Sequence, residues 1–205
     1  MMQKIEAVIF DLGGVILDID YNLTRKAFEK LGVANFNKMY SQASADQLFR
    51  NLETGKIKES DFYVEFNKCI GFCLTPGEIC EAWNSMLLKF REKSLMFLTE
   101  IRSRYRLFLL SNTNKIHYDK FKEIYQERDR AIPFENFFEK AYYSFEIGMR
   151  KPDSDIYEYV LQANRIDRKH TVFIDDSLQN IHTAKSLGMQ TILLETGNYI
   201  ENTGL

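Results

Sequence analysis

The sequence has few cysteines, no excess of positive charge and no long hydrophobic run. Its 205 residues include 27 lysines and arginines against 29 aspartates and glutamates, a formal net charge of -2 at pH 7. This balance argues against general nucleic-acid binding, which needs a basic excess to neutralise phosphates. No apolar stretch approaches the roughly 20 residues of a membrane-spanning helix. The first segment, MMQKIEAVIFDLGG, does not resemble a secretory signal, because Glu6 and Asp11 interrupt it.

The 3 cysteines are Cys69, Cys73 and Cys80. An odd number in a sequence without a secretory signal predicts reduced thiols and a cytoplasmic location. Cys69 and Cys73 are close enough in sequence to share a helix face, but no histidine lies near them. We predict that the thiols are buried as small hydrophobic side chains and are not metal ligands.

Five short runs rich in β-branched or aromatic residues predict β-strands. They are EAVIF (residues 6–10), RLFLL (106–110), KAYYS (140–144), TVFID (171–175) and QTILL (190–194). Several are almost continuously apolar, as expected for strands covered on both faces. Helical patterns lie between them, as in SDIYEYVLQAN and SLQNIHTAKSLG. Strands that alternate with helices predict an α/β fold with a doubly wound, Rossmann-like parallel sheet.

Residues 18–93 show several helix signals and no convincing strand. Thr75 and Glu78 have the spacing of a capping box, and Pro76 stands at the favoured first position of a helix. We therefore predict two domains. Residues 1–17 and 94–205 form the α/β core domain, and residues 18–93 form an all-helical domain inserted after the first strand.

Polar residues stand where four of the predicted strands end. Asp11 follows the first strand, Ser111 the second and Lys151, at a short distance, the third, while Asp175 and Asp176 end the fourth. Loops at the carboxyl ends of parallel strands line one crevice. These side chains are therefore expected to meet there, although they are far apart in sequence.

The chemical types of these residues suit a phosphate ester and a metal ion. Three carboxylates in one crevice repel one another, so a hard divalent cation such as Mg²⁺ is the natural partner. Ser111 and backbone N–H groups at the next helix can hold phosphate oxygens, and Lys151 adds a compact positive charge. Gly13, the first glycine of DLGGV, permits a close backbone approach or an unusual φ.

Four segments of the chain resemble, in order, the four signature motifs of the haloacid dehalogenase (HAD) superfamily. They are FDLGGV, LLSNTN, GMRKP and FIDDS. The likeness covers nearly the whole chain and puts the helical insertion in the C1 cap position. Longer segments, such as DLGGVILDID and GMRKPDSDIY, are similar to the bacterial α-D-glucose-1-phosphate phosphatase branch. The resemblance implies a Mg²⁺-dependent phosphatase for a small phosphorylated metabolite such as a sugar phosphate, with no partner protein.

The resemblance also implies a role for each acidic residue of the motifs. Asp11 would attack phosphorus and form an aspartyl-phosphate, a step that an ionised carboxylate performs without a base. Mg²⁺ would be held by Asp11, the backbone carbonyl of Gly13 and Asp176, with Asp175 assisting. Asn180 is a candidate for supporting this metal loop from the following helix, with a plain helix residue as the open alternative.

The remaining motif residues are implied to hold the transferring group. Ser111 and Asn112 would bind the phosphoryl group, and Lys151 would stabilise its charge. His117 and Arg150 adjoin motif residues and are candidates for contact with the substrate, with structural roles as an open alternative. Specificity would lie in residues 18–93, where aromatic side chains could face a sugar or pack in a core; these are Tyr21, Phe49 and Trp83.

One departure from the superfamily concerns the general acid. Most of its phosphatases have a second aspartate two residues after the nucleophile, and this chain has Gly13 there. General acid–base help is typically worth about 10²–10⁴-fold, so a slow enzyme or an undemanding leaving group is expected. An anomeric hydroxyl leaves more easily than an ordinary alcohol, which favours a sugar 1-phosphate. Asp18 or Asp20 could replace the missing group, or could cap and solvate the junction.

Two other functions are compatible with the missing acid. A haloacid dehalogenase also lacks it, but such enzymes need no Mg²⁺, and Asp176 argues against this alternative. A protein that binds a phosphorylated ligand without turnover is the second alternative. The intact set of nucleophile, serine, lysine and acidic pair argues against it.

Overall fold

The computed structural model describes residues 4–33, 36, 43–128 and 132–205. Its centre is a five-stranded sheet in the order β5-β4-β1-β6-β7, with every neighbouring pair parallel. The strands are β1 (Ala7–Phe10), β4 (Arg106–Ser111), β5 (Lys140–Tyr143), β6 (Thr171–Asp175) and β7 (Gln190–Leu193). All five predicted strands are therefore present, with ends shifted by at most one residue.

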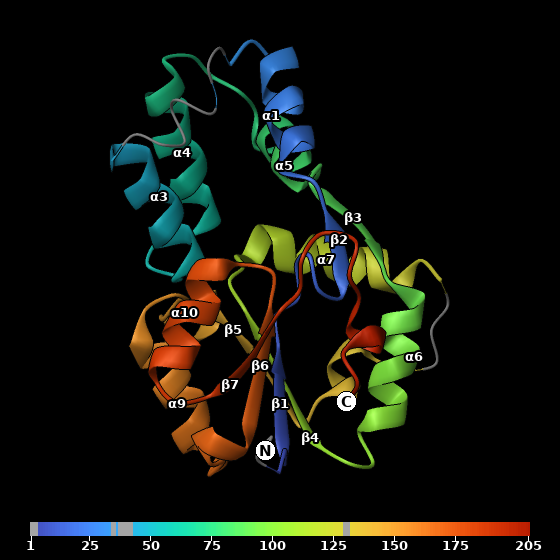
Figure 1. The fold of residues 1–205 in the computed structure, drawn as a ribbon. Coiled ribbons are helices and arrows are strands. Elements are labelled where there is room, and N and C mark those ends of the chain that lie inside the picture. The colour runs from blue at the N-terminus through green and yellow to red at the C-terminus, as the bar shows by residue number, and fades with distance from the viewer. Residues whose placement is uncertain (1–3, 34–35, 37–42, 129–131) are drawn as a thin grey trace.

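Helices cover both faces of this sheet (Figure 1). The first group is α6 (Glu92–Ile101) and α7 (Lys115–Gln126), and the second is α9 (Ser154–Asn164) and α10 (Leu178–Ser186). Alternate side chains of β1 enter different clusters: Val8 and Phe10 pack with α6 and α7, and Ala7 and Ile9 pack with α9 and α10. The predicted doubly wound α/β fold is confirmed.

Shorter helices complete this part of the chain. They are α8 (Ser144–Ile147) and the 3₁₀ helices η1 (Phe134–Phe137), η2 (Arg168–His170) and η3 (Ile200–Asn202). Ile200 of η3 is fully buried and belongs to the cluster of α6 and α7, so the C-terminal segment closes that side of the sheet.

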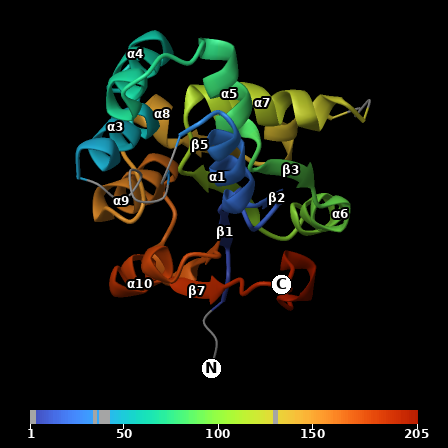
Figure 2. The same ribbon diagram turned by 90° about the horizontal axis from the view of Figure 1, so that it is seen from above.

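A helical lobe lies above the carboxyl ends of the strands (Figures 1 and 2). It consists of α1 (Tyr21–Lys30), α3 (Ala43–Glu53), α4 (Glu59–Ile70) and α5 (Pro76–Asn84). Aromatic side chains form its interior, where Phe28, Phe62 and Phe66 are fully buried. The predicted capping box starts α5, because Thr75 accepts from the Glu78 N–H and the Glu78 carboxylate accepts from the Thr75 N–H.

The structure corrects the expectation that residues 18–93 contain no strand. β2 (Leu17–Ile19) and β3 (Leu87–Phe90) form a two-stranded antiparallel sheet, with Leu17 opposite Phe90. This ribbon joins the helical lobe to the α/β part (Figure 1). Strands of 3 and 4 residues are too short to show an alternating pattern in the sequence. The exact domain boundaries stay a prediction.

The expected burial of the cysteines is wrong for two of the three. Cys69 and Cys73 are exposed, at the end of α4 and in the loop after it, and Cys80 is partly buried. All three are free thiols, and the Cys80 Sγ lies 2.8 Å from the Tyr63 hydroxyl.

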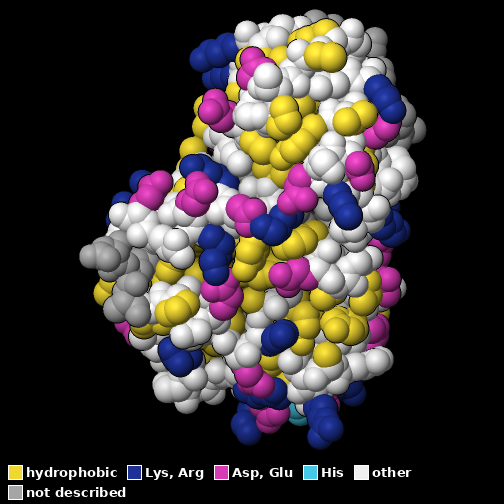
Figure 3. Space-filling model, turned by 180° about the vertical axis from the view of Figure 1, so that it is seen from behind, with side chains coloured by type: hydrophobic (Ala, Val, Ile, Leu, Met, Phe, Trp, Pro, Cys, Tyr) yellow, Lys and Arg dark blue, Asp and Glu magenta, His cyan; other side chains and the backbone are white. Residues whose placement is uncertain are grey.

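The surface carries charges of both signs. On the rear face, lysine and arginine side chains alternate with aspartate and glutamate over both parts of the molecule (Figure 3). Within the described ranges, no helix is both long and apolar enough to cross a membrane.

The aromatic interior of the helical lobe makes a stability prediction. Replacing the fully buried Phe66 by alanine (F66A) removes a ring that packs 5.0 Å from Phe28 and leaves a cavity. We expect the free energy of unfolding to fall by about 3–5 kcal/mol, measured by urea denaturation. V64A on the same helix changes a side chain that is 54% exposed and should cost less than about 0.5 kcal/mol. Equal losses in the two variants would contradict the assigned interior.

Candidate active site

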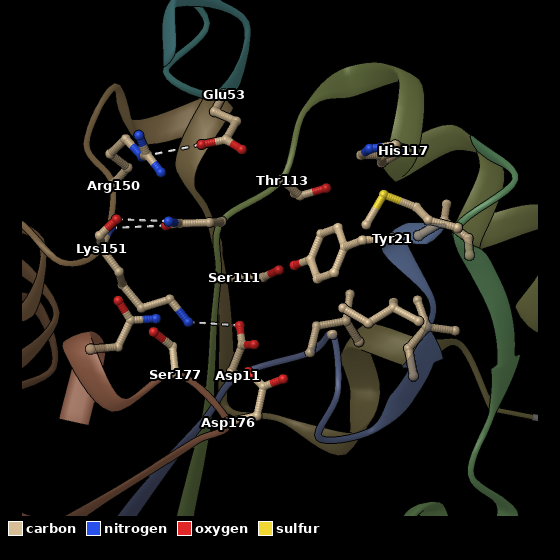
Figure 4. Close-up of a pocket in the computed structure, with 18 of the residues that line it drawn as sticks. Asp11, Tyr21, Glu53, Ser111, Thr113, His117, Arg150, Lys151, Asp176 and Ser177 are labelled. Atoms are coloured by element: carbon tan, nitrogen blue, oxygen red, sulfur yellow. Dashed lines mark hydrogen bonds and ion pairs between the residues drawn. The ribbon is translucent and has the colours of Figure 1, made fainter. Parts of the chain in front are cut away.

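The polar residues at the strand ends meet at one cavity. Asp11 directly follows β1, Ser111 ends β4, and Asp176 follows β6. Together with Lys151 they line a cavity of about 360 Å³ at the carboxyl edge of the sheet, and the close-up shows them around one space (Figure 4). The cavity walls also include residues of the helical lobe, such as Trp83. The sequence prediction of one crevice is therefore met for these four side chains.

A buried lysine links two of the acids. The Lys151 Nζ lies 2.7 Å from Asp11 Oδ1 and 2.7 Å from Asp175 Oδ2. The lysine side chain is 1% exposed and that of Asp175 is 0% exposed, so water cannot replace these contacts. Burial disfavours the ammonium, but the two carboxylates outweigh this cost and raise the pKa of Lys151. The lysine therefore stays charged.

The acids form a cluster that fits a divalent cation. One carboxylate oxygen from each of Asp11, Asp175 and Asp176 lies within 4.8 Å of the others. Within the described residues this is the sole group of its kind. Three carboxylates against one lysine leave excess negative charge, and an all-oxygen donor set suits Mg²⁺. Gly13 lines the same cavity, and its carbonyl is the proposed fourth donor.

Burial and charge repulsion act on the nucleophile candidate. Burial raises the pKa of Asp11 to about 7, with Lys151 opposing the shift and Asp175 adding to it. Burial and the neighbouring Asp175 also raise the pKa of Asp176. Burial and mutual repulsion therefore disfavour full ionisation of these acids.

Asp175 is held by more hydrogen bonds than the other two acids. Its Oδ1 accepts from the Ser177 N–H at 2.8 Å, and the Asn180 side chain donates to both of its oxygens at 3.1 and 3.0 Å. With Lys151 at the second oxygen, this carboxylate is positioned to orient the lysine. The candidate role of Asn180 in supporting this loop agrees with these contacts.

Asn112 lines the cavity, as the sequence predicts, and also makes contacts that the sequence does not indicate. Its side-chain amide donates to the Lys151 carbonyl at 2.8 Å, and its side-chain oxygen accepts from the Lys151 N–H at 2.8 Å. The amide thus clamps the backbone of the lysine loop to the end of β4. The sequence suggested phosphate binding because Asn112 adjoins Ser111, and it contained no signal for this long-range pairing.

The glycine pair after Asp11 works differently from the prediction. Gly14, and not Gly13, has a positive φ, of +72°. A Cβ at Gly14 would lie 2.1 Å from Asp176 Oδ2, so any side chain there would displace this acid. A Cβ at Gly13 would meet only the Ile19 side chain, at 3.1 Å. The second glycine is therefore the one that lets the acidic loops approach.

The two aspartates considered as substitutes for the missing acid are engaged elsewhere. Asp18 pairs with Arg91 at 2.6 Å, beside the two-stranded sheet. Asp20 is the N-cap of α1 and accepts from the Asn22 N–H at 2.9 Å. Neither lines the cavity. The alternative of structural roles at the junction is the one that the contacts support.

Arg150 connects the α/β part to the helical lobe. Its Nε lies 3.1 Å from Glu53 Oε2, and Glu53 ends α3 of the lobe. Both residues line the cavity (Figure 4). Sequence reasoning had named Arg150 but missed Glu53, because nothing in the helical pattern of α3 marks the residue that faces the core.

The aromatic candidates divide into interior and cavity residues. Phe49 is buried in the helical lobe and stacks on Trp83, with ring centroids 4.8 Å apart. Trp83 lines the cavity, and so does Tyr21, which is 68% exposed. Figure 4 shows the Tyr21 phenol directed into the cavity toward Ser111.

Comparisons with known proteins agree with this arrangement. The family model of haloacid dehalogenase-like hydrolases matches residues 8–194. A D-ribitol-5-phosphate phosphatase from Bacteroides thetaiotaomicron is 31% identical, over 94% of this chain and 93% of its own. A sesquiterpene phosphatase from Aspergillus oryzae is 27% identical, over 92% and 89%. The solved structure of a HAD family enzyme from B. thetaiotaomicron, in complex with magnesium and inorganic phosphate, matches with a TM-score of 0.84 at 32% identity, over 94% of this chain and 96% of that one.

The raised pKa of Asp11 predicts that Mg²⁺ binding depends on pH. A cation binds the deprotonated carboxylate, so below a pKa of about 7 it must first displace a proton. We expect the apparent affinity for Mg²⁺ to be about tenfold higher at pH 8 than at pH 6, by isothermal titration calorimetry. Asp176→Asn should weaken binding at both pH values. An affinity that does not change with pH would show that Asp11 is not a ligand.

Proposed function

The chain belongs to the haloacid dehalogenase-like hydrolase family, and on this premise we propose that it is a phosphatase that hydrolyses a small sugar or polyol phosphate through an aspartyl-phosphate. The observation that carries the proposal is the position of Asp11 at the cavity, 2.7 Å from the Lys151 ammonium and clustered with two further acids. The relatives named as phosphatases support the reaction class.

Asp11 is the group placed to attack phosphorus. Lys151 binds its Oδ1, and no described residue donates a hydrogen bond to its Oδ2. In the proposed first step Oδ2 forms a bond to phosphorus, and the alcohol oxygen leaves with the electron pair of the broken P–O bond. Water then attacks phosphorus, the bond between Asp11 Oδ2 and phosphorus breaks, and inorganic phosphate is released. The proton that the water loses balances, through solvent, the one that the leaving alkoxide takes up. The buried Ser111 hydroxyl and the Lys151 ammonium hold the phosphoryl oxygens during both steps.

Asp11, Asp176 and the Gly13 carbonyl would hold Mg²⁺, with Asp175 in support. When bound, the ion would offset the negative charge on the phosphoryl oxygens. The acidic cluster and the magnesium-bound structure of a 32% identical enzyme support this assignment. The same cluster supports a phosphatase over a metal-independent dehalogenase.

The cavity and the relatives support the proposed substrate class. A cavity of about 360 Å³ accommodates a small metabolite. The ribitol-phosphate enzyme at 31% identity supports a polyol phosphate, whereas the sequence motifs favour α-D-glucose 1-phosphate. The two differ in their leaving groups, because a primary alcohol needs a proton donor more than an anomeric hydroxyl does.

The helical lobe would serve as a cap in this reaction. Its ribbon β2–β3 and the Glu53–Arg150 pair join it to the α/β part beside the cavity. We infer that the inserted domain of residues 18–93 shields the reacting groups from water. Three free thiols are compatible with the proposed cytoplasmic location.

The assigned nucleophile makes a direct prediction. Asp11→Asn keeps the shape of the side chain but removes the attacking charge, so we expect kcat to fall by at least about 10³-fold. Phosphate release from a panel of phosphorylated metabolites measures it. D61N, on the exposed side of α4, is the matched control and should retain wild-type activity. Turnover that survives D11N would refute the mechanism.

The missing general acid makes a second prediction, which also separates the two substrates. Gly13→Asp restores an acid where the chain has room for one, with only the Ile19 side chain to move. We expect the rate of phosphoryl transfer to Asp11, measured in a single turnover, to rise about 10–100-fold with ribitol 5-phosphate, whose leaving group needs a proton, and much less with glucose 1-phosphate. G13N has the same volume without the acid and should show no gain. Equal gains in G13D and G13N would mean that the acid is not the limiting feature.

A further inference from the structure

We propose that His117 selects substrates that carry a free hydroxyl, by accepting a hydrogen bond from that hydroxyl at its Nε2. The proposal rests on the phosphatase function proposed above and adds the group that reads the organic part of the substrate. His117 lines the same cavity as Asp11, Ser111 and Lys151. In Figure 4 it lies on the opposite side of the cavity from Asp11 and Asp176.

The backbone of His117 is held close to the end of β4, the strand that carries Ser111. Asn114 caps α7 by accepting from the His117 N–H at 3.0 Å, three residues after Ser111 ends β4. The segment between the phosphoryl-binding serine and the imidazole is therefore short and ends in a capped helix start. This geometry holds the ring at a constant place relative to the reacting groups.

The helical lobe fixes the orientation of the ring. The His117 Nδ1 lies 2.9 Å from the side-chain oxygen of Asn84, the last residue of α5. A carboxamide oxygen only accepts hydrogen bonds, so the proposal assigns the proton to Nδ1. Asn84 is not a wall residue of the cavity, so the nitrogen that the proposal leaves for a ligand is Nε2.

Stacking covers one face of the His117 ring and leaves this edge for contact with a ligand. Trp83 stacks on His117 with centroids 5.3 Å apart and planes at 7°, and on Phe49 at 4.8 Å and 7°. The indole lies between the two rings, so a sugar cannot stack on it. The Thr24 hydroxyl on the same wall already donates to the Trp83 carbonyl.

The chemistry of Nε2 decides what it can bind. Burial lowers the pKa of His117 to about 3, so the ring is neutral at physiological pH. With the proton on Nδ1, Nε2 presents a lone pair, and no described residue donates a hydrogen bond to it. A lone pair repels a phosphoryl oxygen but accepts a hydrogen bond from a hydroxyl group. A ligand whose phosphoryl group sits at Asp11 and Lys151 would therefore present a hydroxyl at the far wall.

Two substitutions separate the contributions of the two ring nitrogens to substrate selection. In His117→Asn the amide reaches the Nδ1 position, so donation to Asn84 is kept and the Nε2 acceptor is lost. In His117→Gln the longer amide places an oxygen near the Nε2 position and restores an acceptor. A merely structural role for the ring predicts the reverse order, because H117Q loses the contact with Asn84.

The readout is the ratio of kcat/KM for ribitol 5-phosphate or glucose 1-phosphate to that for propyl phosphate, which has no free hydroxyl. We expect the wild type to prefer a hydroxylated ester. H117N should lower the ratio about tenfold, mainly through KM, because a change of this size corresponds to the loss of one hydrogen bond. H117Q should recover part of the lost ratio. In the D11N variant, binding of the hydroxylated ester should also shift the ¹⁵N resonance of His117 Nε2.

The failures of the two proposals are distinguishable. A wild type that hydrolyses none of the three esters contradicts the proposed phosphatase. A wild type that hydrolyses propyl phosphate as well as the hydroxylated esters overturns the role of His117 and leaves the phosphatase intact. An unchanged ratio in folded H117N, or equal losses on all esters, overturns it as well.

Discussion

The site depends on one buried ion triplet, in which the Lys151 ammonium lies between Asp11 and Asp175. A buried charge is costly unless it is paired and hydrogen-bonded, and each of the three groups here supplies the partner that the others need. The triplet also joins three separate parts of the chain, the ends of β1 and β6 and the loop after α8. Removing the lysine would leave two buried acids facing each other. The same ion pairs therefore stabilise the edge of the sheet and position the residues of the site.

The surrounding contacts explain how this triplet is held in place. Asn112 fixes the backbone of the lysine, and Asn180 and the Ser177 N–H fix Asp175 from the start of α10. Asp11, in contrast, keeps one oxygen without a hydrogen bond from a described residue. The restraint on the supporting groups and the freedom of the oxygen proposed to attack are what nucleophilic attack requires. Gly14 then brings Asp176 close by having no side chain.

The sequence was sufficient to predict the parallel sheet, because its strands are short apolar runs that end in polar residues. The same logic placed Asp11, Ser111, Lys151 and Asp176 at one cavity. It could not reveal contacts between residues that are distant in sequence. Asn112 looked like a neighbour of Ser111, and only the fold shows that it clamps Lys151. The ribbon β2–β3 was missed because pairing between distant, very short segments leaves no local pattern, and Glu53 because its partner Arg150 lies in the other part of the chain.

The account can be tested most directly by trapping the covalent intermediate. Without a general base near Gly13, water should release phosphate from Asp11 slowly, so the aspartyl-phosphate should accumulate during turnover. Acid quenching followed by peptide mass spectrometry measures its amount and position. The account predicts a phosphate on the peptide that contains Asp11. A phosphate on another residue, or turnover with no covalent phosphate at any time, would contradict it.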